Sequence, residues 1–232
     1  MKINKTSPKD VSRRFEDFAS IIEKRVRKNK EVTVPEFKYN IQDFGDQFVS
    51  ANALPKFNKT AQRLAETLIG LNNDRLAGII YSTLIKLNRN TDAKFVEDIA
   101  TKALAIARRK HDPVHIAARA NDLKEIYKLS EYGSDKHLKI LKEEKRALGD
   151  ICKNYKGAKS RFETIARQMR PVEKYQEMLA AIRLEIAEVL IKRGEDIPLA
   201  KEELLMAKAF YDQFEAGHNA KKIVAILKKL EG

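Results

Sequence analysis

The sequence predicts an all-α protein built from antiparallel helical hairpins, and three observations lead to this prediction. Only six Pro and nine Gly interrupt 232 residues, whereas Ala, Leu, Ile, Lys and Glu, which suit helices, are abundant. Apolar residues recur at spacings of three and four, which places them on one face of a helix. The polar connections between these segments are short, so consecutive helices have to run in opposite directions.

Residues 1–57 are predicted to form an amphipathic helix followed by an irregular connector. Ser7 and Pro8 favour a helix start, because Ser caps helices and Pro suits their first turn. The apolar stripe that follows consists of Val11, Phe15, Phe18, Ile22 and Val26. From Phe37 to Lys59 we expect an irregular stretch, with a short helix over 41–49, whose aromatic residues dock on the rest of the protein.

Residues 58–232 are predicted to form a helical-repeat domain with at least eight helices and no sheet. Caps and breakers divide this segment; Asp112-Pro113 is typical of a helix start, and Gly157 and Gly194 are typical of helix ends. The expected helices cover residues 59–71, 73–88, 92–110, 113–131, 135–154, 158–169, 172–193, 197–214 and 218–231.

A pattern of small and large residues recurs on several of these helices. It is clearest near the C-terminus, in the sets Ala181, Leu184, Ala187 and Ala200, Leu204, Ala207. Each set lies on one face of its helix, where small residues let a neighbouring helix approach closely. We therefore expect Ala187, Ala200 and Ala207 to be buried at helix–helix contacts.

This pattern resembles the tetratricopeptide repeat family, in which pairs of antiparallel helices stack into a superhelix. The resemblance is closest from Leu179 to Leu230 and returns from Asp92 to Tyr127. The Trp and the Leu-Gly pair of the family's first helix are missing here, and the spacing between the patterns is irregular. The resemblance implies an α-solenoid, and an irregular helical bundle is the alternative.

Such a solenoid binds its partner on a concave face formed mainly by the first helix of each pair. The polar residues expected on that face are Arg119, Asp122, Lys145, Arg146, Arg183 and Lys192. Because the formal net charge is +13, this face would suit an extended acidic peptide. The sequence therefore predicts a non-enzymatic scaffold for protein–protein interactions.

Nucleic-acid binding is the alternative, because cations are dense in and just after the first predicted helix. They are Arg13, Arg14, Lys24, Arg25, Arg27, Lys28 and Lys30. No recognised nucleic-acid motif accompanies them, and acidic residues lie among them. A third interpretation is that the same helix attaches to a membrane surface through its apolar stripe, although such stripes more commonly pack inside a protein.

No catalytic or metal-binding constellation is expected. Pro113 places His111 before a helix, so His111 and His115 would not share the face that a metal pair needs. Cys152 lies among apolar residues and is expected to be an inert buried thiol. The adjacent carboxylates at 143–144 and 202–203 diverge on a helix, and we expect them only to balance nearby lysines.

Composition also bounds the compartment. The single Cys excludes an intramolecular disulfide and favours a reducing environment. No apolar run approaches the roughly 20 residues of a membrane span, and the N-terminus lacks the apolar region of a secretory signal. We therefore expect a cytoplasmic protein that needs no cofactor or metal and binds a protein or an acidic peptide.

Overall fold

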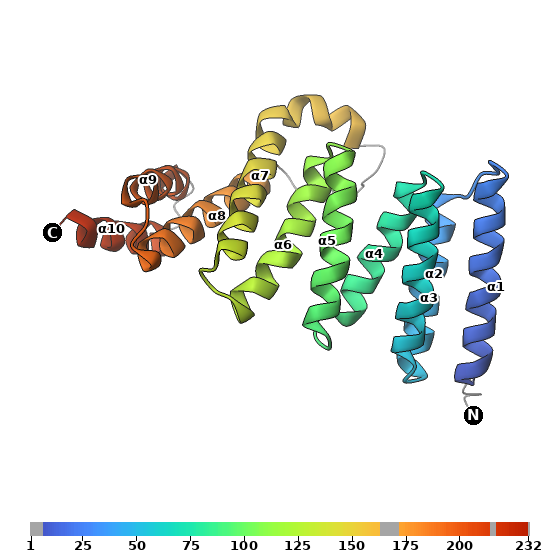
Figure 1. Ribbon diagram of the computed structural model, residues 1–232. Coiled ribbons are helices and arrows are strands. Elements are labelled where there is room, and N and C mark those ends of the chain that lie inside the picture. Colours follow the sequence, from blue (N-terminus) through green and yellow to red (C-terminus); the bar gives the residue numbers. More distant parts are fainter. Residues whose placement is uncertain (1–6, 163–171, 214–216, 232) are drawn as a thin grey trace, which may run out of the picture. The chain divides into compact units, whose positions relative to one another are not determined.

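The computed structural model describes residues 7–162, 172–213 and 217–231, with the backbone alone for 155–162 and Gly217. This described part of the chain is all-helical, with ten helices and no strand (Figure 1). None of these helices combines the length and the apolar character that crossing a bilayer requires. The chain divides into two compact units, residues 1–106 and 107–232.

The first unit holds the N-terminal helices, α1 (Pro8–Arg27), α2 (Val34–Ser50), α3 (Leu54–Gly70), α4 (Asp74–Asn88) and most of α5 (Ala93–Arg109). The predicted start of α1 is confirmed. The Ser7 hydroxyl accepts a hydrogen bond from the Asp10 backbone N–H at 3.2 Å, and Pro8 lies in the first turn. Within this unit, α1 packs on α2 and α3, and α2 also packs on α4.

The segment expected to be irregular is helical, which corrects the sequence-based prediction. Val34–Ser50 forms α2, and α3 begins at Leu54, so the expected boundary at 57/58 falls inside α3. Pro35 and Pro55 lie in the first turns of these helices, where their missing N–H breaks no hydrogen bond. The actual interruption is at Asn52, whose φ of +52° turns the chain between the two helices.

A cluster of aromatic rings joins α1, α2 and α3. The ring of the fully buried Phe15 in α1 lies 5.0 Å, centroid to centroid, from both Phe44 of α2 and Phe57 of α3. Phe48 of α2 lies 5.9 Å from Phe15 and 5.5 Å from Phe57. Phe37, Phe44 and Phe48 share one face of α2, because they are spaced by seven and four residues. The apolar stripe of α1 is thus used for packing inside the first unit.

A pair of amides fixes the register of the α3–α4 hairpin. The Asn58 side chain donates to Asn88 Oδ1 at 2.7 Å, and the Asn88 side chain donates to Asn58 Oδ1 at 3.0 Å. The Asn88 amide also donates to the Leu84 carbonyl at 2.8 Å. Since Asn58 lies near the start of α3 and Asn88 ends α4, this pairing holds the two helices antiparallel.

The second unit holds the C-terminal helices, α6 (Pro113–Ser130), α7 (Asp135–Phe162), α8 (Val172–Arg193), α9 (Ile197–Gln213) and α10 (Gly217–Glu231), which pack on one another in chain order. Gly157 does not end a helix as expected but lies within α7, because one Gly costs a helix only about 1 kcal/mol. The helix predicted over 158–169 is in part the end of α7, and its remainder lies outside the described residues. The expected minimum of eight helices beyond Asn58 is met when α3 is counted, which begins slightly earlier, at Leu54.

The three alanines expected at helix–helix contacts are buried, whereas Ala181 of the same pattern is exposed. Ala187 of α8 and both Ala200 and Ala207 of α9 are 0% exposed. They belong to one apolar core that also contains Leu204 of α9 and Ile223 of α10. Alanine side chains in this position allow the backbones of neighbouring helices to come close, so little room is left for a larger side chain.

The aromatic cluster predicts a large cost for Phe15→Ala. We expect the free energy of unfolding to fall by about 3–5 kcal/mol, because the variant leaves a cavity at the junction of three helices. Chemical denaturation followed by circular dichroism measures this change. The matched control is Tyr39→Ala on α2, whose side chain is 68% exposed and should cost less than about 0.5 kcal/mol. Equal costs for the two variants would contradict the aromatic core.

The buried alanines predict that Ala207→Leu overpacks the α9 interface. We expect the free energy of unfolding to fall by about 1–3 kcal/mol, because the added carbons have no space. The control is Ala209→Leu, two residues further along α9 and exposed, which should be nearly neutral. A neutral Ala207→Leu in denaturant titration would show that the seam is not closely packed.

Candidate functional site

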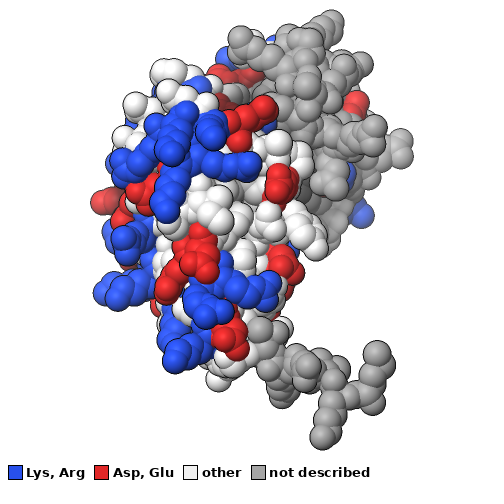
Figure 2. All heavy atoms as spheres, turned by 90° about the vertical axis from the view of Figure 1, so that its right-hand side faces the viewer, with Lys and Arg blue, Asp and Glu red and all other residues white. Residues whose placement is uncertain are grey.

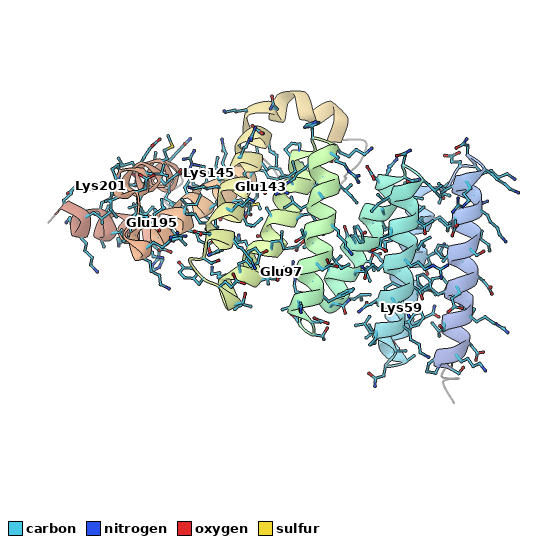
Figure 3. The ribbon with its side chains drawn as sticks, viewed as in Figure 1. Lys59, Glu97, Glu143, Lys145, Glu195 and Lys201 are labelled. Carbon is cyan, nitrogen blue, oxygen red and sulfur yellow. The ribbon has the colours of Figure 1, made fainter. Side chains whose placement is uncertain are left out.

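Two of the six predicted partner-binding residues meet inside the second unit. Lys145 of α7 (Figure 3) and Arg183 of α8 both form ion pairs with Glu203 of α9, whose side chain is 2% exposed. Arg183 Nη1 lies 2.7 Å from Glu203 Oε2, and Lys145 contacts the other carboxylate oxygen. Each oxygen of this buried carboxylate therefore has its own cation, and the three side chains tie three helices together.

The remaining predicted residues are distributed differently. Arg119 and Asp122 form an ion pair of 3.1 Å within α6, with side chains 16% and 7% exposed. Lys192 Nζ lies 4.7 Å from the ring centroid of Tyr132, and Arg146 is exposed. Cations that neutralise buried acids are poor anchors for a partner, because recruiting them would leave a buried charge unpaired. The concave binding face thus stays a prediction.

The burial of Glu144 and Glu203 was not predicted from the sequence. Glu144 is 1% exposed, whereas its neighbour Glu143 forms an ion pair with Arg108 at the surface (Figure 3). The helical spacing does indicate this burial, because Glu144 falls on the apolar face of α7 between Leu141 and Leu148. Glu203 falls in the same way between Ala200 and Ala207 of α9. The 100° divergence of adjacent residues that argues against a carboxylate dyad also directs one carboxylate of each pair inward.

Burial strongly perturbs Glu144, an acid of the second unit. Removal from water raises the pKa of its carboxyl to about 7, although Lys124 of α6, with Nζ 3.4 Å from Oε2, acts in the opposite direction. Neither carboxylate oxygen has a hydrogen bond within the described structure. Glu144 is therefore a buried acid that changes charge near neutral pH.

A buried histidine lies on the same helix as this acid. His137 is 0% exposed, and its Nδ1 accepts a hydrogen bond from the Gly133 backbone N–H at 3.2 Å. Its Nε2 lies 3.5 Å from Glu185 Oε1 of α8, which also lies 3.6 Å from Lys128 Nζ. Burial lowers the pKa of His137, so its ring is neutral at neutral pH. Lys124 and Glu144 therefore join α6 to α7, and Glu185 of α8 contacts both the buried His137 of α7 and the half-exposed Lys128 of α6.

The histidine pair His111 and His115 flanks the start of α6, and Cys152 lies in α7. His111 has a φ of +50° and precedes Asp112, whose carboxylate caps α6 by accepting from the Val114 and His115 N–H groups at 3.1 Å. His111 therefore lies outside the helix that carries His115, as predicted. Burial raises the pKa of the Cys152 thiol, which disfavours the reactive thiolate. Among the residues with described side chains, no group of three or more His, Cys, Asp or Glu is arranged to hold a metal ion.

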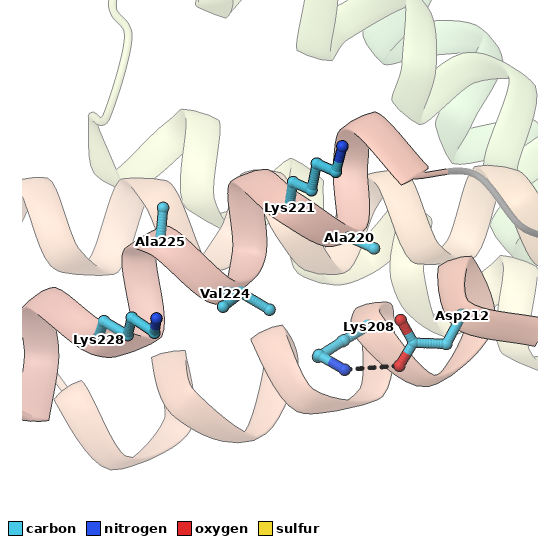
Figure 4. Close-up of a pocket in the computed structure, with 7 residues that line it drawn as sticks. All are labelled: Lys208, Asp212, Ala220, Lys221, Val224, Ala225 and Lys228. Carbon is cyan, nitrogen blue, oxygen red and sulfur yellow. Dashed lines mark hydrogen bonds and ion pairs between the residues drawn. The ribbon is translucent and has the colours of Figure 1, made fainter.

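A shallow groove lies between α9 and α10 on the surface of the second unit. It has a volume of about 390 Å³ and is lined by Lys208, Asp212, Ala220, Lys221, Val224, Ala225 and Lys228 (Figure 4). On its α9 wall, Lys208 and Asp212 form an ion pair of 2.6 Å. The centre of the groove is apolar, and lysines lie at its ends.

The two lysines of α10 carry the charge of this groove. Lys221 and Lys228 are exposed, and no acidic partner is recorded for either within the described part of the chain. Their neighbour Lys222, by contrast, forms an ion pair with Glu188 of α8. The fully buried Ile223 shows that another face of α10 packs on the core, which leaves Lys221, Val224, Ala225 and Lys228 on the groove side.

The cations of α1 form no comparable hollow with a single sign of charge. Figure 2, which faces this side of the first unit, shows Lys and Arg in separate groups with Asp and Glu between them. Arg27 is held by Glu23 at 2.8 Å, and the Arg14 guanidinium lies 6.0 Å from the ring centroid of Phe44. A smaller hollow of about 140 Å³ between α1 and α2 is lined by both Arg25 and Glu36.

The sequence matches no model of a known protein family and none of the curated proteins with which it was compared. The tetratricopeptide-like arrangement therefore stays a prediction. Any function for this chain has to be argued from the geometry and charge of its own residues.

The buried acid predicts how stability depends on pH. Because the folded protein holds the Glu144 proton up to about pH 7, while the unfolded chain releases it near the ordinary value of 4.5, stability is lost as pH rises between these values. The free energy of unfolding of Glu144→Gln, relative to that of wild type, should therefore increase by on the order of 3 kcal/mol between about pH 4 and pH 8. Urea denaturation at a series of pH values measures this difference.

His137 changes stability in the opposite sense. Its pKa is lowered on folding, so its contribution is lost as pH falls through the ordinary value of 6.5. Since both proteins contain His137, its effect cancels in the comparison of Glu144→Gln with wild type. Glu202→Gln, at an exposed position on α9, is the control and should leave the pH profile unchanged. A pH-independent difference for Glu144→Gln would contradict the buried protonated acid.

Proposed function

We propose that this protein is a non-enzymatic interaction module that binds an acidic segment of a partner protein in the α9–α10 groove. One observation carries the proposal: two exposed lysines, Lys221 and Lys228, flank an apolar centre formed by Val224 and Ala225. Apolar contact supplies affinity when it is shielded from water, and the flanking charges select an acidic ligand and its register.

The groove is favoured over the concave face that the sequence predicts. On that face, Lys145 and Arg183 neutralise Glu203, and Arg119 is paired with Asp122. A partner could use those cations only by competing with internal carboxylates. In the groove, Lys221 and Lys228 project beside an apolar hollow, so binding an acid there opens no ion pair.

A protein segment is favoured over nucleic acid because the apolar centre of the groove has no use in phosphate binding. Phosphate contacts require cations along a continuous track, whereas here two lysines are separated by Val224 and Ala225. Acidic residues also lie among the cations of α1, and Figure 2 shows acidic side chains between basic groups on this side of the first unit. The net charge of +13 still predicts weak, salt-sensitive association with any polyanion.

Selection from a phage-displayed library of random sixteen-residue segments tests the proposal. Segments selected on the wild-type protein should be rich in Asp and Glu. They should bind Lys221→Glu/Lys228→Glu weaker by about tenfold or more, measured by fluorescence anisotropy. The matched control is Lys139→Glu/Lys153→Glu, which makes the same charge change at exposed positions of α7 and should bind as wild type does.

Two outcomes would overturn the proposal. Selected segments without acidic enrichment, or segments that bind the groove variant as well as the control variant, would place binding elsewhere. Tight binding of a generic DNA duplex at physiological salt, lost on charge reversal of Lys24 and Arg25, would instead identify nucleic acid as the ligand. Circular dichroism of each variant, together with Lys221→Gln/Lys228→Gln, separates lost binding from lost folding.

A further inference from the structure

We infer that the segment bound in the α9–α10 groove is an amphipathic α-helix whose acidic residues lie two turns apart. This inference rests on the proposed function and specifies the conformation of the partner. It follows from three features of the groove: the spacing of its lysines, the size of the side chains between them, and the place of α10 in the packing order.

The spacing of the lysines matches a helical ligand. Lys221 and Lys228 are seven residues apart on α10, a rise of about 10.5 Å along the helix axis. Acids seven residues apart on a partner helix have the same spacing on one face. In an extended ligand, side chains on one face recur about every 6.6 Å, so the nearest spacings are about 6.6 and 13 Å. A strand would therefore align one acid with a lysine and misplace the next.

The side chains between the lysines are small. Ala220, Val224 and Ala225 form the part of the groove contributed by α10 apart from its lysines, and Figure 4 shows Ala220 and Val224 on the side that faces α9. Small residues at such positions let a further helix approach the backbones closely, as the buried alanines Ala200 and Ala207 do on α9. Two apolar residues of the partner, three and four positions after its first acid, would fill this centre.

Among the described helices, only α9 and α10 line this groove. Each helix from α7 to α9 packs on two described neighbours, whereas α10 packs mainly on α9. A helix laid in the groove would contact α9 and α10 together. The Lys208–Asp212 pair on the α9 wall is already neutral, so the charge that selects the ligand comes from α10.

Designed peptides test the helical mode. The first is a sixteen-residue, Ala-rich helix with two Glu seven positions apart and Leu at the third and fourth positions between them. The second has the same composition, but its Glu residues are five positions apart and therefore lie on different faces. The third carries Pro at the centre of the first. Fluorescence anisotropy with the full chain measures the affinity of each peptide, and circular dichroism measures its helicity.

We expect the first peptide to bind at least about tenfold more tightly than the other two, and to lose this advantage with Lys221→Glu/Lys228→Glu. Lys139→Glu/Lys153→Glu should preserve it. Equal binding of all three peptides that still depends on Lys221 and Lys228 would overturn the helical mode while leaving the acidic-segment proposal intact. No binding by any of them at millimolar concentration would overturn the helical mode, and library segments that bind independently of the two lysines would overturn the proposed function itself.

Discussion

The close packing of α9 against its neighbours through fully buried alanines is the constraint on which the second unit depends. Ala200 and Ala207 leave no space for larger side chains, so the rotation of α9 about its axis is fixed. Ile223 then commits one face of α10 to the same core. The positions of Lys221 and Lys228 follow, because a helix that buries one face has to present another to solvent.

Buried charge is the second determinant of this unit. Glu203 lies among apolar residues of α9 and is tolerated because Lys145 and Arg183 reach its two oxygens from α7 and α8. Glu144 has a single lysine and no hydrogen bond, and it responds by holding its proton up to about pH 7. The two acids illustrate both responses to burial, pairing and neutralisation. They also explain why cations expected at a binding face instead stabilise the interior.

Local signals in the sequence were sufficient to predict the all-helical class and most of the helices. Caps such as Ser7 and Asp112 located helix starts, because one side chain satisfies backbone N–H groups there whatever the rest of the chain does. The failure at residues 34–50 has a non-local cause. Pro35 and Pro55 are compatible both with a loop and with the first turn of a helix. The aromatic residues that favour the helix act through contacts with Phe15, which lies far away in the sequence.

The candidate site was less accessible from the sequence. Adjacent carboxylates and scattered lysines do not reveal which side chain points inward until the rotation of each helix is known, and that rotation is set by packing between helices. Lys221 and Lys228 are two of the 46 Lys and Arg residues, and no local feature of the sequence distinguishes them. Their significance depends on Val224 and Ala225 lying between them and on α9 forming the opposite wall of the groove.

Nuclear magnetic resonance mapping of the designed acidic helix on the isotope-labelled full chain tests the central claim most directly. We expect the largest changes in backbone amide chemical shift at residues that line the groove, above all Lys208, Lys221, Val224 and Lys228. Amides of α1 and those around Lys145 and Arg183 should remain unchanged at the same peptide concentration. Shifts that centre on α1 or on the Glu203 ion pairs, with the α9–α10 groove unaffected, would contradict it.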